Sequence, residues 1–89
     1  MDIINEYRDE ILKQWTEKLK KIFKYYLPFE EINDTAAMEE CKTVWKWHII
    51  DTGWKPKILK DLTINNENIE KEIIIDAFNK LGLPKEIIE

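Results

Sequence analysis

Apolar residues recur at helical spacing along most of the chain and predict three main helices, over about residues 2–27, 35–52 and 67–81. In the first segment, with each residue turned by 100°, the apolar side chains fall on one arc about 160° wide. These side chains are Ile3, Ile4, Tyr7, Ile11, Leu12, Trp15, Leu19, Ile22, Phe23 and Tyr26. Asp2 is expected to cap this helix, and Pro28 to end it because it disfavours helical geometry at Leu27.

The second segment concentrates the rarer residue types, since residues 35–54 contain the only cysteine, the only histidine and three of the four tryptophans. Its core-facing arc comprises Ala37, Met38, Cys41, Val44, Trp45, His48 and Ile49. Trp47 and Ile50 fall on the other side of this helix. Their neighbours there are polar: Glu39, Glu40, Thr43 and Lys46. We expect Asp34 or Thr35 to cap the helix and Gly53 to end it in a left-handed conformation.

Two connecting segments flank this helix. Residues 29–34 predict a short acidic connector whose apolar residues, Phe29 and Ile32, reach into the core. Residues 57–62 fit either a short fourth helix, with Pro56 at its start, or an extended strap. We favour the short helix.

The third main helix has an apolar arc formed by Ile69, Ile73, Ile74, Ala77, Phe78 and Leu81. The consecutive isoleucines at 73–75 also suit a strand, but the flanking signals favour a helix. Gly82, followed by an apolar residue and then proline, is typical of a helix C-terminus. Residues 85–89 predict a terminal helical turn or a frayed tail.

The length limits the chain to a single small domain over residues 1–89, and the helical periodicity predicts an all-α bundle of three main helices with a short fourth. A chain of 89 residues holds one modest core and no large enclosed substrate pocket. One cysteine cannot form an internal disulfide, and the N-terminus does not resemble a signal peptide. No stretch approaches 18 apolar residues, so we expect no membrane association and a cytoplasmic location.

Two residues could suggest catalysis, namely Cys41 and His48. On one helix, a separation of seven residues places them about 10 Å apart, too far for a nucleophile–base pair or a shared metal. We interpret both as core residues, and we interpret the acidic clusters as solvated faces. The sequence therefore predicts no catalytic, cofactor or metal site and no enzyme, with a small enzyme or metal protein centred on His48 as one alternative.

The first helix carries a group of lysines, most of them in its C-terminal half: Lys13, Lys18, Lys20, Lys21 and Lys24. These lysines suit the negative end of a helix dipole. They also permit a second alternative, a nucleic-acid-associated regulator that uses the Lys-rich half of this helix. Because the formal net charge is −4, nucleic acid is not expected as a partner.

Outward-facing apolar residues on the second helix predict a protein-binding site. The expected partner-binding residues are Trp47, Ile50, Trp54, Glu39, Thr43 and Lys46. The opposing interpretation is that residues 57–64 or the third helix cover Trp47, which would make the second helix a buried central element.

The function predicted from these residues is a non-enzymatic protein-binding module that occludes or bridges a partner protein. A composition rich in Ile, Lys, Asn and Glu suggests an A/T-rich genome and an inhibitor or accessory protein of a phage or other mobile element. The long first helix, about 37 Å at 1.5 Å per residue, also suggests a homodimer, with part of its apolar stripe against a second copy.

Overall fold

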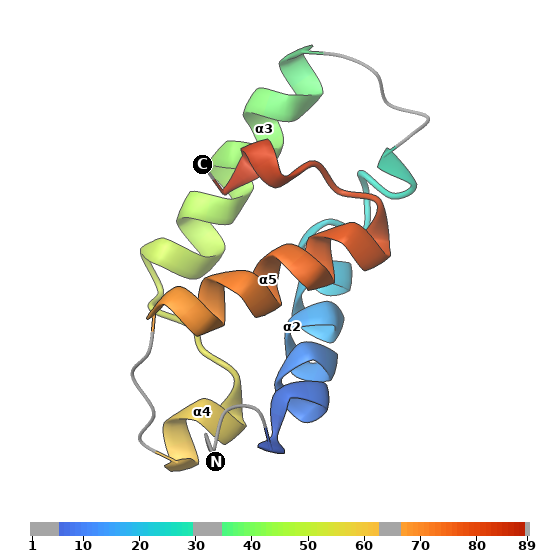
Figure 1. The fold of residues 1–89 in the computed structure, drawn as a ribbon. Helices are drawn as coiled ribbons and strands as arrows, with labels where there is room; N and C mark the ends of the chain where they lie inside the picture. The colour runs from blue at the N-terminus through green and yellow to red at the C-terminus, as the bar shows by residue number, and fades with distance from the viewer. Residues whose placement is uncertain (1–5, 30–34, 63–66, 89) are drawn as a thin grey trace.

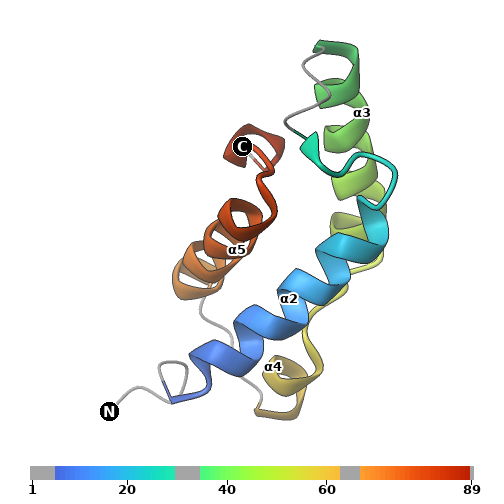
Figure 2. The ribbon, with the colours of Figure 1, turned by 90° about the vertical axis from the view of Figure 1, so that its right-hand side faces the viewer.

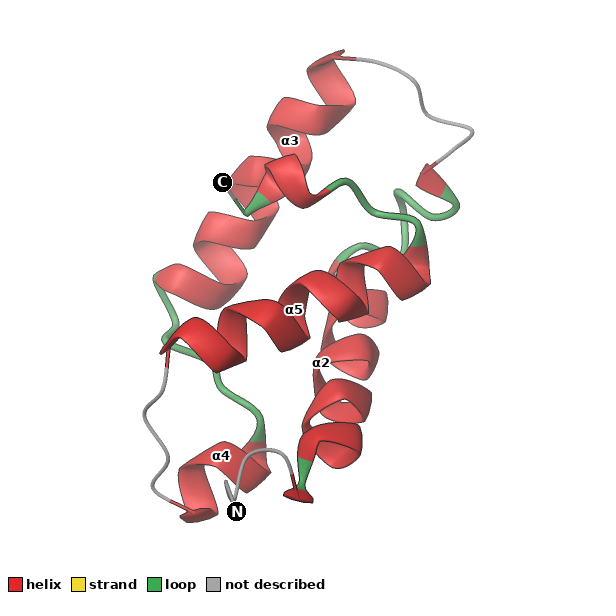
Figure 3. Cartoon of the chain, viewed as in Figure 1, coloured by secondary structure: helices red, strands yellow, loops and turns green. Residues whose placement is uncertain are grey.

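The computed structural model describes residues 6–29, 35–62 and 67–88. Regular structure in these ranges is entirely helical, which confirms the all-α class (Figure 3). The elements in chain order are α2 (Arg8–Ile22), α3 (Thr35–Trp45), the π-helical turn η2 (Lys46–Ile50), α4 (Lys57–Leu62), α5 (Glu67–Leu81) and the 3-10 turn η3 (Lys85–Ile87).

The helices form two layers in a body of 42 × 24 × 20 Å. α2 and α3 run in opposite directions in one layer, and α5 crosses in front of both (Figure 1). The view turned by 90° shows α5 and the C-terminal turn on one side, with α2 and α3 on the other (Figure 2). The most extensive packing is between α2 and α5, while η3 packs on α3 and α4 packs on α2.

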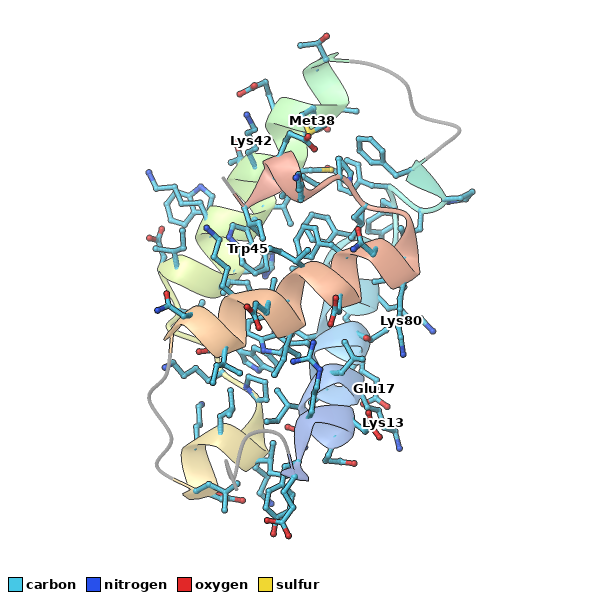
Figure 4. The ribbon with its side chains drawn as sticks, viewed as in Figure 1. Lys13, Glu17, Met38, Lys42, Trp45 and Lys80 are labelled. Atoms are coloured by element: carbon cyan, nitrogen blue, oxygen red, sulfur yellow. The ribbon has the colours of Figure 1, made fainter. Side chains whose placement is uncertain are left out.

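The core lies between these layers and is built from apolar residues at helical spacing. Its buried members are Ile11, Trp15, Leu19, Phe23, Cys41, Trp45, Ile49, Leu59, Ile73, Ala77, Phe78, Leu83 and Ile87. Trp45 connects the layers, since its ring centroid lies 5.9 Å from that of Trp15 and 5.4 Å from that of Phe78. Figure 4 shows Trp45 between α3 and α5.

The first predicted helix is shorter than the pattern suggests. It ends at Ile22, and the N–H of the capping residue Phe23 donates to the carbonyl of Leu19. A turn follows, in which Tyr26 folds back with its ring 6.5 Å from Phe23 and its hydroxyl donating to Glu40. The helix therefore ends well before Pro28, and the turn that follows brings the Tyr26 hydroxyl to Glu40 of α3. The predicted cap at Asp2 lies outside the described residues.

The other helix predictions agree closely with the structure. α3 and η2 together cover residues 35–50, and Gly53 follows with a φ of 66°. Residues 57–62 form the short helix α4 and not a strap, and α5 has the predicted bounds 67–81. The predicted cap at Asp34 and anchor at Ile32 lie outside the described residues.

The C-terminus of α5 has the two hydrogen bonds of a Schellman motif. The N–H of Leu83 donates to the carbonyl of Phe78 at 2.9 Å, and that of Gly82 to Asn79 at 3.2 Å. Gly82 has a φ of 72°, which only glycine adopts without strain. The motif directs Leu83 and then Ile87 into the core, so the C-terminal segment is a packed helical turn.

Candidate functional site

A π-helical turn sets which side chains of residues 46–50 face outward. The N–H of Asp51 donates to the carbonyl of Lys46 at 2.9 Å, five residues earlier instead of four. A wider turn rotates each residue by less than the 100° of an α-helix, so the faces shift after Trp45. Ile49 is buried as predicted, but His48 is exposed, and its assignment to the core arc is wrong for this reason.

Trp47 and Ile50 form an exposed apolar pair on this turn. Each is 63% exposed, which confirms that they point away from the core. The neighbouring residues Trp45 and Ile49 are buried and fix the turn from its inner side. We refer to Trp47 and Ile50 as the η2 patch.

Polar side chains extend along α3 toward the η2 patch. Glu39, Thr43 and Lys46 are all exposed. The hydroxyl of Thr43 donates to the backbone carbonyl of Glu39 at 3.0 Å. The Glu39 carboxylate lies 3.7 Å from the Nζ of Lys42, so its charge is partly balanced within the helix. These residues give the patch a polar margin.

Trp54 does not share the exposure of the other two predicted residues. It is partly buried, and its ring packs nearly perpendicular to that of Trp15 with the centroids 4.9 Å apart. The Nζ of Lys18 lies 5.2 Å from the Trp54 centroid, within cation–π distance. Trp54 thus lies against α2, in a groove that Trp47 and Ile50 do not line.

The structure does not support Cys41 as a nucleophile. Its side chain is fully buried, and burial, with a smaller contribution from the charge of Glu40, raises the pKa of the thiol from 9.0 to about 11. A protonated thiol is a weak nucleophile and a weak metal ligand. His48, in contrast, is exposed on η2. In the ranges 6–29, 35–62 and 67–88, no three His, Cys, Asp or Glu residues are placed to hold a metal ion.

A groove of about 420 Å³ runs between α2 and α4. Its lining residues are mainly lysines: Gln14, Glu17, Lys18, Lys21, Trp54, Lys55, Lys57 and Lys60. Five lysines and one glutamate give this lining a formal charge of +4, in a chain whose net charge is −4. The sequence pattern grouped Lys18 and Lys21 with the other lysines of α2. It did not predict that the packing of α4 would place further lysines beside them.

A second groove, of about 320 Å³, lies on another side of α2, toward the end of α5. It is lined by Asp9, Leu12, Lys13, Thr16, Glu17, Lys20 and Lys80. Figure 4 shows Lys13 and Glu17 projecting from α2 on the side where Lys80 projects from α5. Glu17 lines both grooves, so the two adjoin along α2.

Comparison of the chain with protein-family models, curated proteins and solved structures gives no match. Among the described residues, no helix has the length and apolar character needed to cross a bilayer. What the protein binds must therefore be inferred from its own surfaces.

Proposed function

We propose that the protein is a non-enzymatic protein-binding module and that the η2 patch is its contact surface. The supporting observation is the exposure of Trp47 and Ile50, 63% each, on one turn. Burying a large apolar side chain against a partner contributes about 1.5–3 kcal/mol. Tryptophan is also among the residues most enriched at the energetic centres of interfaces.

The rigidity of the turn favours binding. Trp45 and Ile49 hold η2 to the core, so Trp47 is presented on ordered backbone and association costs little further ordering. The exposed Glu39, Thr43 and Lys46 supply the polar rim that surrounds the apolar centre of a typical interface. A suitable partner has an apolar pocket with an acceptor for the indole N–H. Occupying that pocket would occlude or bridge the partner.

Affinity capture from the native host tests this function when wild type is compared with Trp47→Ala. We expect a host protein that wild type retains and Trp47→Ala loses. Tyr25→Ala is the matched control, because Tyr25 is also an exposed aromatic residue, at 79%, outside α3 and η2. Equal recovery of every host protein by wild type and Trp47→Ala would refute the proposal.

The homodimer prediction through the first helix has less support than the sequence suggested. The apolar stripe of α2, including Ile11, Trp15 and Leu19, is fully buried by the chain itself. A second copy could still occupy the η2 patch, and sedimentation equilibrium of wild type against Trp47→Ala distinguishes that case. The inhibitor or accessory role in a phage or mobile element stays a prediction from composition.

A further inference from the structure

We propose that the two grooves along α2 form one continuous site for the phosphate backbone of a nucleic acid. This site, the lysine surface, is distinct from the η2 patch. Its lysines come from three parts of the chain: Lys13, Lys18, Lys20 and Lys21 on α2, Lys55 before α4 with Lys57 and Lys60 on it, and Lys80 on α5.

The charge of the lysine surface is opposite to that of the rest of the chain. Its eight lysines and two acids, Asp9 and Glu17, give a formal charge of +6. Because the whole chain carries −4, the remainder carries −10. The overall net charge therefore conceals a local positive field of the kind that attracts polyanions.

Specific contacts build this surface by holding α4 against α2. The backbone N–H of Ile58 donates to the side-chain oxygen of Gln14 at 3.3 Å. Leu59 is 3% exposed and anchors α4 in the core. Lys57 and Lys60 therefore lie on an anchored helix, across the groove from Lys18 and Lys21.

Most of these ammonium groups are free to bind a ligand. Of the eight lysines, only Lys55 forms an ion pair within the described part of the chain, at 3.7 Å from Glu70. Lys18 lies over Trp54. The lysines of this surface repel one another in the folded chain, because their like charges lie close together. A bound polyanion would remove this repulsion.

The repeating phosphates of a nucleic acid suit a surface built from many lysines. Lysine binds phosphate as a point charge without the planar fork of arginine, and a nucleic acid presents one phosphate at every nucleotide. The only arginine in the chain, Arg8, is paired with Asp76. An extended backbone that contacts both grooves passes Glu17, the one carboxylate that lines both of them. Since Trp54 already contacts Trp15 and Lys18, we expect phosphate contacts without base stacking, and hence no sequence preference.

Fluorescence anisotropy with a labelled oligonucleotide of about 20 nucleotides, single-stranded and as a duplex, tests the proposal across a salt series. The single-stranded and duplex arms show which form of the backbone the grooves accept. We expect binding at low salt, with log K falling linearly against log salt. Three to five phosphate contacts predict a slope of about −2.7 to −4.5 for the duplex and about −2 to −3.5 for the single strand. No binding of either form at the lowest salt would overturn the proposal.

Two charge-matched double variants separate the site from overall charge. Lys57→Glu with Lys60→Glu changes α4, and Lys71→Glu with Lys85→Glu makes the same charge change at exposed positions outside both grooves. We expect the α4 variant to bind at least about tenfold more weakly with a slope shallower by about two, and the control to change by less than about threefold. Equal weakening would overturn the proposal.

Two further measurements complete the test. Lys20→Gln with Lys80→Gln changes only the second groove, and it decides the outcome if circular dichroism shows the α4 variant to be unfolded. We expect this second-groove variant to weaken binding and Trp47→Ala to leave binding unchanged. Unchanged binding by the second-groove variant would contradict one continuous site.

A length-matched oligo-glutamate peptide should compete poorly with the oligonucleotide. Competition at lower concentration than the oligonucleotide would instead identify an acidic protein partner and overturn the proposal.

Discussion

Trp45 and Trp47 lie two positions apart on one helical run, yet Trp45 is 8% exposed and Trp47 is 63% exposed. The inner indole contacts Trp15 of α2 and Phe78 of α5. The two residues therefore separate stability from recognition on a single turn: one holds the layers together, and the other is available to a partner.

We expect Trp45→Ala to lower the free energy of unfolding by about 3–5 kcal/mol, because it leaves a cavity where three elements meet. Trp47→Ala should change it by less than about 0.5 kcal/mol, since it removes an exposed side chain. Urea denaturation followed by far-UV circular dichroism measures both. A large destabilisation by Trp47→Ala would show that the indole contributes to the core and would remove the basis of the proposed interface.

Local signals explain which parts of the fold could be predicted. The bounds of α5 follow from its periodicity and from Gly82, whose conformation is determined within a few residues. The outward orientation of Trp47 also followed from periodicity. His48 was misassigned because one π-helical turn changes the rotation per residue, which a fixed helical period does not include.

Tertiary packing explains what could not be predicted. The early end of α2 is followed by a turn that brings Tyr26 to Glu40 of α3, and nothing near Ile22 in the sequence marks it. The basic groove joins Lys18 to Lys57 and Lys60, which are about forty residues apart in sequence. Runs of charge along the sequence show only the lysines of α2. The packing of α4 on α2 brings the other lysines of the groove beside them.

The ion pair between Arg8 and Asp76 links the start of α2 to α5. Because both side chains are about one-third to one-half exposed, we expect Asp76→Asn to cost only about 0.5–1 kcal/mol. The loss should shrink in high salt, which screens exposed charges. A double-mutant cycle with Arg8→Gln isolates the pair, and a coupling energy near zero at low salt would contradict this expectation.

Substitution of Gly53 tests how much the left-handed backbone after η2 depends on glycine. Its φ is 66°, and a Cβ added there would meet nothing within 4 Å, so any cost of substitution comes from the backbone alone. We expect Gly53→Ala to destabilise the fold by about 1 kcal/mol and Gly53→Asn by less, since asparagine tolerates this conformation better. Thermal denaturation of the two variants measures the order; an alanine variant as stable as wild type would contradict it.

The burial of Cys41 predicts that the stability of the fold depends on pH. The pKa of the thiol is about 11 in the folded chain, against an ordinary value of 9.0. Below pH 9 both states keep the proton, so stability is unaffected. Above it the unfolded chain loses the proton first, and stability falls as pH rises toward 11, by about 2 kcal/mol at most.

Cys41→Ala isolates this contribution, because it removes the thiol and leaves every other titrating group in place. We expect wild type to lose more stability than Cys41→Ala between pH 9 and 10.5, measured by urea denaturation at each pH. The same burial predicts that a thiol reagent labels Cys41 slowly in the folded chain and rapidly in urea. Parallel pH profiles together with rapid labelling of the folded chain would show that the thiol is accessible, and the core around Trp45 and Ile49 would then be open to solvent on the α3 side.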